Sequence, residues 1–182
     1  MLVVAFIIKL DSPGPVLFKQ KRIGQKKKTF TMLKFRSMPI SFANDIPTHL
    51  LTEAVPLTKW QRFMRRSSID ELPQLFNILA GHMSLIGPRP ALWNQDDLIA
   101  ARDEHGANDV RPGMTGLAQI NGRDQVSITE KARLDGVYTQ ALNRGGFRGF
   151  AMDTRCFFGT FSVVLRGSGV REGGVAEDEH HE

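Results

Sequence analysis

The chain has 182 residues, 41% of them hydrophobic, which is enough for one folded domain with a buried core. Its formal net charge of +5 indicates an anionic partner, such as a nucleotide, a phospholipid surface or nucleic acid. One cysteine, Cys156, excludes an intramolecular disulfide and fits a reducing compartment, and its apolar neighbours predict that it is buried packing. The five histidines show no metal-ligand spacing.

The N-terminal stretch Leu2–Ile8 is a continuous apolar run. It is shorter than the about 20 residues that a membrane-spanning helix needs, and it lacks the charged region and cleavage site of a signal peptide. The simplest interpretation is a buried strand or the end of a helix. Asp11–Pro15, which follows, has the composition of a turn.

A β-hairpin is predicted next. Roughly alternating apolar residues indicate strands at Val16–Arg22 and Thr29–Arg36, joined by the short link Gly24–Lys28. The segment is rich in basic residues, namely Lys19, Lys21, Arg22, Lys26, Lys27, Lys28, Lys34 and Arg36. Two interpretations of the lysine-rich link stay open: a solvated tip that protects the edge strands, or a surface attracted to anionic lipid headgroups.

The stretch Pro39–Pro56 has the polar and proline content of a loop. A passive linker is the default interpretation, and closure over a substrate is the functional alternative. Leu57–Met64 is predicted as a helix with Trp60, Phe63 and Met64 on one face. For Trp60, core packing is favoured over a position at a membrane interface.

A helix is predicted in the middle of the chain from four residues at the spacing of one apolar face, Leu72, Leu75, Phe76 and Leu79. Gly81 is expected just beyond its end. Ser68 and Glu71 could form a capping box, but a start at Ile69 or Asp70 is preferred, because Pro73 then falls in the first turn. Asp70 would lie at the positive end of the helix dipole, where its ionised form is favoured and a phosphate is attracted.

The adjacent carboxylates Asp70 and Glu71 are candidate catalytic residues. A pair of this kind at a helix start is ordinarily explained by capping and dipole compensation. Nearby cations, Arg65, Arg66 and Arg89, favour the alternative of a carboxylate nucleophile in phosphoryl transfer. The two prolines that flank Arg89 stiffen its backbone, which suits forked contacts to phosphate. The common alternative is an arginine whose stem covers apolar surface.

The block Val110–Asp124 is a second candidate region. Its glycines, including Gly113 and Gly116, allow the close backbone approach that phosphate and nucleotide sites need. Glycine-rich turns alone are weak signals, and Asn-Gly-Arg at 121–123 is by itself usually only a turn.

The rest of the chain reads as helices and a tail. Ala91–Glu104 and Ile128–Leu142 are predicted helices, and Gly145–Gly149 is predicted to interrupt the chain before Ala151–Leu165. This apolar segment has two interpretations, a helix lying in the plane of a membrane or the last helix of the core. The chain after Gly167 is glycine-rich and then acidic, and it is expected to fray.

Several blocks carry a resemblance to a known family. SSIDELPQLFNILAGHMSLIGPRP, ending at Pro90, resembles the signature of the bacterial sugar transferases, which are monotopic phosphoglycosyl transferases such as undecaprenyl-phosphate galactose or glucose phosphotransferases. Further matching blocks follow in family order: SPGPVLFKQKRIG at Ser12–Gly24, LKFRSM at Leu33–Met38 and VRPGMTGLAQINGRD at Val110–Asp124. The resemblance runs from about Lys9 to Val175, and several long motifs in order are far more specific than one short pattern.

Elements and resemblance together predict an α+β fold: a mostly helical single domain with a β-hairpin near the N-terminus and membrane-associated helices. The resemblance implies that residues 1–10 are the remnant of a re-entrant membrane helix whose first half this sequence lacks. Residues 11–170 would be the catalytic domain, and residues 171–182 an acidic, disordered tail. The protein would be monotopic, at the cytoplasmic face of the inner membrane.

The resemblance also implies a reaction, the transfer of a sugar-1-phosphate from a UDP-sugar to a polyprenyl (undecaprenyl) phosphate with release of UMP. This would be the first membrane step of exopolysaccharide, capsule, O-antigen or glycoconjugate synthesis. Asp70 would be the nucleophile and form an aspartyl-phosphosugar intermediate, while Glu71 would position Mg²⁺ or handle a proton. Asp70 and Glu71 would hold the Mg²⁺ cofactor. The expected ligands of the substrate phosphates and nucleotide are Lys34, Arg65, Arg89, Arg111 and Arg123, with Arg36 near the same site.

Two other functions compete with this one. The chain could be a truncated family member without activity, or a non-enzymatic basic module that binds a membrane or nucleic acid. No nucleic-acid motif is present, and aromatic residues are not interleaved with the basic ones, so no nucleic-acid partner is expected. A homodimer is compatible with the sequence. The identity of the sugar, the polymer and the polyprenol length is not encoded in any motif.

Overall fold

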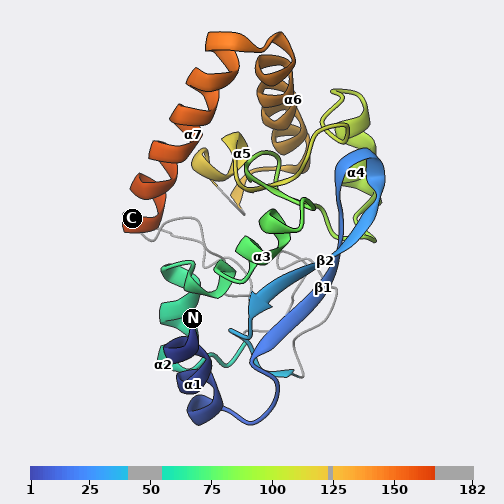
Figure 1. The fold of residues 1–182 in the computed structure, drawn as a ribbon. Helices are drawn as coiled ribbons and strands as arrows, with labels where there is room; N and C mark the ends of the chain where they lie inside the picture. Colours follow the sequence, from blue (N-terminus) through green and yellow to red (C-terminus); the bar gives the residue numbers. More distant parts are fainter. Residues whose placement is uncertain (41–54, 123–124, 167–182) are drawn as a thin grey trace, which may run out of the picture.

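The computed structural model describes residues 1–40, 55–122 and 125–166, which form a mixed α and β fold dominated by helices (Figure 1). The elements, including the 3-10 turns η1 and η4, are α1 (Leu2–Asp11), β1 (Leu17–Ile23), η1 (Gln25–Lys27), β2 (Thr29–Phe35), α2 (Lys59–Arg66), η4 (Ile69–Glu71), α3 (Gln74–Leu79), β3 (Ser84–Ile86), α4 (Asp96–Asp103), β4 (Gly113–Thr115), α5 (Leu117–Ile120), α6 (Ile128–Arg144) and α7 (Gly146–Arg166). This confirms the predicted α+β class with many helices and an N-terminal hairpin. In the described ranges, no helix is both long and apolar enough to cross a membrane.

The hairpin pairs β1 with β2 in antiparallel register, with Leu17 opposite Phe35 and Ile23 opposite Thr29. The two strands begin and end within one residue of the predicted bounds. The alternating apolar pattern therefore located this element correctly.

The lysine-rich tip of the hairpin rests on the loop that follows α4. Lys27 forms a 3.0 Å ion pair with Asp103, and the main-chain N–H of Lys26 donates to the carbonyl of Asn108 at 2.7 Å. Both residues of the Lys27–Asp103 pair remain about half exposed. Neither interpretation of this link anticipated that the tip would be tied to another part of the chain.

A lower hydrophobic cluster joins α1, β2 and α2 through Ile8, Phe35 and Met64, all of which are buried. The apolar N-terminal run thus forms a helix of which Ile8 alone is buried, so the expectation of a buried run is wrong for most of its residues. Trp60 is partly buried against the same cluster, which confirms core packing for this residue. Ile69, immediately before Asp70, also packs here, so the cluster supports the turn that carries the candidate nucleophile.

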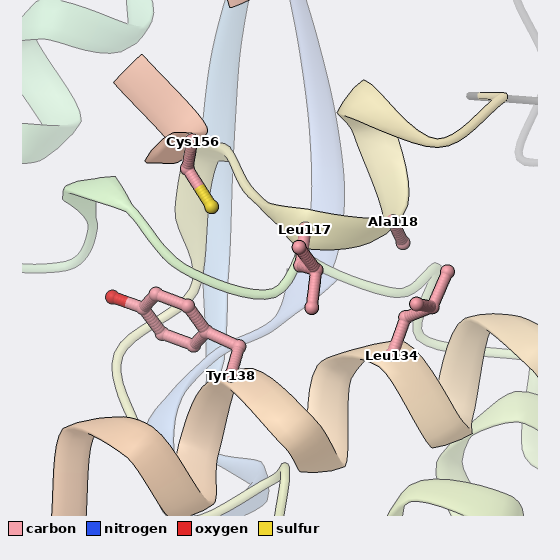
Figure 2. Close-up of a cluster of buried hydrophobic side chains, with 5 residues drawn as sticks. All are labelled: Leu117, Ala118, Leu134, Tyr138 and Cys156. Atoms are coloured by element: carbon pink, nitrogen blue, oxygen red, sulfur yellow. The ribbon is translucent and has the colours of Figure 1, made fainter. Parts of the chain in front are cut away.

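An upper cluster lies among α5, α6 and α7 (Figure 2). Its buried members are Leu117, Ala118, Leu134, Tyr138 and Cys156. Cys156 is completely buried, as predicted, and burial raises the pKa of its thiol to about 11. A neutral thiol in apolar surroundings is inert packing rather than a reactive group.

The parallel pair β3–β4 explains two of the glycines in the second candidate region. Ser84 pairs with Gly113 and Ile86 with Thr115. A Cβ atom added at Gly113 would overlap the main chain of Gly87, and one added at Gly116 would overlap the Gly87 carbonyl. The predicted close backbone approach exists, but its partner within the protein is the main chain at Gly87.

The predicted central helix is wrong in its start and in its inner face. A 3-10 turn, η4, carries Asp70, and α3 begins only after Pro73, so neither proposed cap is used. On α3, Leu75, Phe76 and Leu79 are exposed, whereas Gln74 and Asn77 are buried. Gly81 has a φ of +77°, which confirms its place just beyond the helix end.

Two other boundaries also differ from the predictions. The helix expected at Ala91–Glu104 begins at Asp96, because the carbonyl of Ala91 accepts from the N–H of Ile23 at 2.9 Å and holds this stretch beside β1. The break expected at Gly145–Gly149 is confined to Gly145, and α7 starts at the next residue. Most of the Pro39–Pro56 loop and the whole acidic tail lie outside the described residues.

Candidate functional site

Asp70 lies in η4, which contacts β2 and α2. The turn starts at Ser68, whose φ of +57° reverses the chain after α2. Asp70 is 7% exposed, and its Oδ2 accepts a 3.0 Å hydrogen bond from the hydroxyl of Ser37. This serine directly follows the LKFR part of the hairpin block.

The pKa of Asp70 is raised, because burial disfavours the charged carboxylate. Lys34, Arg65 and the Ser37 hydrogen bond act in the opposite direction, and the charge of Glu71 adds to the rise. The predicted stabilisation by a helix dipole is wrong, since η4 is a single 3-10 turn and α3 begins only after Pro73. Lys34, Arg65 and the Ser37 hydroxyl favour the charged form of Asp70, and burial outweighs them.

Glu71 lies in the middle of a partly buried ion-pair group. Nη1 of Arg89 donates to its Oε2 at 3.1 Å and Nη2 donates to its Oε1 at 2.5 Å, while Nζ of Lys34 reaches Oε1 at 3.2 Å. Burial alone would raise the pKa of Glu71, but Arg89 and Lys34 outweigh it and hold the pKa well below the usual range. Glu71 is therefore ionised, and its two cations are oriented by it.

Lys34 is brought to this site by β2, where only 15% of its side chain is exposed. Burial is the main cause that lowers its pKa, and the charge of Arg89 adds to this, while Glu71 opposes it. Its strand is fixed from the other side by α3. The Asn77 side chain accepts from the N–H of Leu33 at 2.9 Å and donates to the carbonyl of Thr31 at 2.8 Å.

The structure brings together five of the predicted site residues, Lys34, Arg65, Asp70, Glu71 and Arg89. We call these five and Ser37 the Asp70 cluster. Arg65, in the last turn of α2, lies close enough to lower the pKa of Asp70. Arg111 is exposed, and no contact among the described residues joins its side chain to the cluster. Arg123 lies outside the described residues.

Arg36 does not join this cluster. Its guanidinium donates to the carbonyl of Pro13 and, at 2.7 Å, to the carbonyl of Ser12. It is 4% exposed and holds the turn that connects α1 to the hairpin. The expectation that Arg36 lines the site is therefore wrong. Arg36 directly follows β2, the strand that carries Lys34, but its side chain fixes the N-terminal turn.

Sequence reasoning missed Ser37 and Asn77. Both lie inside the blocks that carry the family resemblance, but a serine or an asparagine in isolation gives no signal of its role. Two buried glutamines, Gln74 and Gln119, were also missed. Their amide groups have no hydrogen-bond partner within the described part of the chain, which is costly for buried polar atoms.

A Mg²⁺ site formed by Asp70 and Glu71 fits these residues poorly. Both oxygens of Glu71 already accept hydrogen bonds from Arg89 and Lys34, and Oδ2 of Asp70 accepts one from Ser37. Only Oδ1 of Asp70 accepts no hydrogen bond from the described residues. These residues also contain no group of three His, Cys, Asp or Glu side chains that could hold a metal ion. We therefore derive no step through Mg²⁺, and its involvement stays a prediction.

Comparison with known proteins gives the geometry a context. The sequence profile described as bacterial sugar transferase matches residues 1–167. The chain is 39% identical over 166 residues to the "uncharacterized sugar transferase EpsL" of Bacillus subtilis (strain 168), an alignment that covers 91% of this chain and 78% of that protein. It is 40% identical over 179 residues to the "exopolysaccharide production protein PSS" of Rhizobium leguminosarum bv. phaseoli, with 93% and 88% covered.

A longer relative has a more specific name. The "UDP-glucose:undecaprenyl-phosphate glucose-1-phosphate transferase" of Escherichia coli (strain K12) is 40% identical over 131 residues. The alignment covers 70% of this chain but 28% of that protein. The Asp70 cluster, a buried carboxylate surrounded by cations, is therefore the site whose chemistry has to be explained.

Proposed function

The chain belongs to the bacterial sugar transferase family, and from this premise we propose that it transfers a sugar-1-phosphate from a UDP-sugar to undecaprenyl phosphate, with release of UMP. The observation that carries the proposal is Asp70, a buried carboxylate with one oxygen held by Ser37 and with Lys34 and Arg65 nearby. UDP-glucose is the first donor to test, because relatives with that donor in their names share about 40% identity.

In the proposed first step, Oδ1 of Asp70 attacks the phosphorus atom that is bonded to the sugar. A new O–P bond forms, the bond from this phosphorus to the bridging oxygen breaks, and UMP leaves with the electron pair. A carboxylate suits this role because it acts without losing a proton. Ser37 holds Oδ2, so the second oxygen is the one available for attack.

In the second step, an oxygen of undecaprenyl phosphate attacks the same phosphorus atom. The bond to Asp70 breaks, the carboxylate is regenerated, and the lipid carries a diphosphate-linked sugar. Charge accumulates on the phosphoryl oxygens in both steps, and fixed cations stabilise such charge strongly in a partly buried site. Lys34, Arg65 and Arg89 are the described cations at the Asp70 cluster that would do this.

Arg89 and Lys34 would exchange partners during the reaction. Without substrate they bind Glu71, and a substrate diphosphate would offer them a second set of acceptors. Arg89 suits this exchange because its guanidinium makes forked contacts with carboxylates and phosphates alike. In this proposal Glu71 keeps both cations oriented and charged until the donor binds.

The proposed location is the cytoplasmic leaflet of the inner membrane, where the lipid acceptor resides. Support comes from exposed apolar side chains on helices at the surface. On α1 these are Leu2, Val3, Phe6 and Leu10. On α7, exposed apolar residues recur at the spacing of one helical face, at Phe147, Phe150, Phe158, Phe161 and Leu165. Faces of this kind bind the interfacial region of a bilayer.

The test is UMP release from a panel of UDP-sugars that begins with UDP-glucose, with Mg²⁺ present and undecaprenyl phosphate in nanodiscs. Without the acceptor, the mechanism predicts at most one UMP per active site and a phosphosugar adduct on the peptide that contains Asp70. The Asp70→Asn variant should release no UMP. Turnover by that variant would exclude Asp70 as the nucleophile, and silence of the wild type with every donor would favour an inactive family member.

A further inference from the structure

The structure contains a buried ion pair that the proposed chemistry does not use. Nε and Nη2 of Arg102, on α4, donate to Oδ2 of Asp135, on α6, at 2.8 and 2.6 Å. The two side chains are 5% and 1% exposed. Removing both charges from water is costly, so a pair of this kind often has a role beyond stability.

A third hydrogen bond connects this pair with the Asp70 cluster. Nη2 of Arg102 also donates to the main-chain carbonyl of Arg89 at 2.9 Å. The side chain of that same Arg89 makes the forked contact with Glu71. A continuous set of contacts therefore leads from Asp135 through Arg102 and Arg89 to Glu71.

Three successive main-chain carbonyls, at residues 88 to 90, each accept a hydrogen bond. The Pro88 carbonyl accepts from the N–H of Gly113 at 2.8 Å, and the Pro90 carbonyl accepts from Nη1 of Arg22 at 2.9 Å. The Arg89 carbonyl between them accepts from Arg102. Proline rings restrict φ at 88 and 90, and Pro90 also confines ψ of Arg89 to extended values. Within that range, the bond from Arg102 holds the direction of the Arg89 carbonyl.

We propose that Arg102, oriented by Asp135, is a positioning residue for Arg89. By holding the Arg89 carbonyl it sets the direction in which the guanidinium leaves the backbone, toward Glu71 and the diphosphate of the donor. Arg102 touches neither Glu71 nor substrate and acts through Arg89. The expected effect of Arg102 on UMP release rests on the proposed function. The expected alignment of Arg89 with Glu71 does not.

A double-mutant cycle on UMP release tests the kinetic consequence. Arg102→Met should lower kcat/KM about tenfold, equivalent to about 1.4 kcal/mol of transition-state stabilisation. In an Arg89→Lys background, which has already lost the forked contact, the same change should cost less than about twofold, because coupled residues are not additive. Equal losses in both backgrounds would overturn the proposal and leave Arg102 as a tie between α4 and α6.

Leu134→Ala is the matched control. Leu134 neighbours Asp135 on α6 and packs in the upper cluster, so its loss should lower the melting temperature at least as much as Arg102→Met. It has no contact with the Arg89 carbonyl, and kcat/KM should remain within about twofold of the wild type. An equal kinetic loss in Leu134→Ala would mean that general destabilisation explains Arg102→Met, against the proposal.

A cycle on melting temperature needs no substrate. Glu71→Gln should lower the melting temperature of the full chain, and the decrease should be clearly smaller in the Arg102→Met background, where Arg89 is no longer aligned with Glu71. If the wild type releases no UMP, the proposed function fails, and this melting-temperature cycle alone tests the role of Arg102. Equal decreases from Glu71→Gln in the wild-type and Arg102→Met backgrounds would overturn the inference. Should Arg102→Met not fold, Arg102→Lys, which keeps the charge beside Asp135 but loses the fork, replaces it with the same expectations.

Discussion

The Ser37 hydroxyl donates a 3.0 Å hydrogen bond to Oδ2 of Asp70, and both residues are buried. Ser37 lies two residues beyond the end of β2, the strand that also carries Lys34. One short stretch of chain therefore supplies a cation and a hydroxyl to the candidate nucleophile. The hydroxyl stabilises the carboxylate form and leaves Oδ1 as the oxygen proposed to attack the donor.

Removal of the Ser37 hydroxyl should shift the acid limb of the pH–rate profile upward. Burial already raises the pKa of Asp70, and the Ser37 hydrogen bond opposes that rise. In Ser37→Ala the pKa should rise further, so a smaller fraction of Asp70 is ionised as the pH falls. On the acid limb of the profile, UMP release by Ser37→Ala should be at least about tenfold lower than that of the wild type. The reason is that a hydrogen bond to a charged group contributes about 1.5–3 kcal/mol. Ser37→Thr, which keeps the hydroxyl, should restore the profile, and an unshifted limb in Ser37→Ala would contradict the assignment.

Asp70→Asn should abolish UMP release and yet stabilise the fold. The folded-state pKa of Asp70 is raised, so the charged form is less favourable in the folded protein than in the unfolded chain. This cost is absent below the unfolded pKa and complete once the pH exceeds the folded pKa. In urea unfolding, the free energy of unfolding of Asp70→Asn should therefore increase relative to that of the wild type as the pH rises from 4 to 8. The expected gain is about 0.5–2 kcal/mol, as is common when a strained active-site group is replaced. A less stable Asp70→Asn at pH 8 would contradict this reading.

The candidate catalytic pair, Asp70 and Glu71, and the hairpin could be predicted from sequence. The face of α3 that is buried could not. Helical spacing correctly placed Leu75 and Leu79 on the same side, yet that side is exposed. Asn77 takes the inner side, because its amide can replace a missing strand partner beside β2. Periodicity shows which residues share a face, whereas the long-range partner decides which face is buried.

The contacts of Glu71 could not be predicted from local patterns either. Its partners Lys34 and Arg89 lie 37 and 18 residues away and come from a strand and a loop. Each was an expected phosphate ligand because of its motif, and the ion pair between them and Glu71 is a property of the folded chain. For the same reason Arg36, two residues from Lys34, was assigned to the site although its side chain binds the Ser12–Pro13 turn.

Glu71→Gln should destabilise the fold at neutral pH, and the loss should be about 1 kcal/mol smaller at pH 3.5. The pKa of Glu71 is lowered in the folded state, so its pairing with Arg89 and Lys34 stabilises the fold above the unfolded pKa of about 4.3. This contribution is lost as the pH falls from there toward the folded pKa. At pH 7 the expected loss is about 3–5 kcal/mol, typical of breaking a buried pair. Urea unfolding of the wild type and of Glu71→Gln at pH 7 and at pH 3.5 measures the loss of stability at each pH.

Glu130→Gln is the matched control for that experiment. Glu130 pairs with Arg133 on α6, but both side chains are about half exposed. Its replacement should cost much less stability at pH 7 than Glu71→Gln, because exposed ion pairs contribute little. If the two variants lose the same stability, the Glu71 group is no stronger than a surface ion pair.

Asn77→Ala should loosen the contact between α3 and β2 and lower both stability and activity. The change leaves the N–H of Leu33 and the carbonyl of Thr31 without their side-chain partner, and since both bonds are only partly buried we expect a loss of about 1 kcal/mol for each. UMP release should fall as well, because β2 carries Lys34. Leu79→Ala on the same helix is the control, since Leu79 is 83% exposed and its change should stay within about 0.5 kcal/mol. Equal effects of the two substitutions in urea unfolding would exclude the role given to Asn77.

Replacement of the exposed phenylalanines on α7 should weaken membrane binding without unfolding the protein. Phe150, Phe158 and Phe161 are 68%, 65% and 54% exposed, whereas Cys156 on the opposite side is buried in the upper cluster. Each ring would withdraw roughly 100 Å² of apolar surface from water on entering a bilayer, or about 2.5 kcal/mol. In flotation assays with liposomes, Phe158→Ser should therefore lower the partition coefficient at least about tenfold, and the triple serine variant should lower it further.

Val137→Ser is the control for this experiment. Val137 lies on α6 and is 38% exposed, so its substitution tests a partly exposed apolar residue away from the α7 face. We expect its partition coefficient to stay within about twofold of the wild type, and all variants should keep the wild-type circular dichroism spectrum. Phenylalanine variants that float as well as the wild type would show that the α7 face does not contact lipid, and would leave the apolar residues of α1 as the remaining candidate contact.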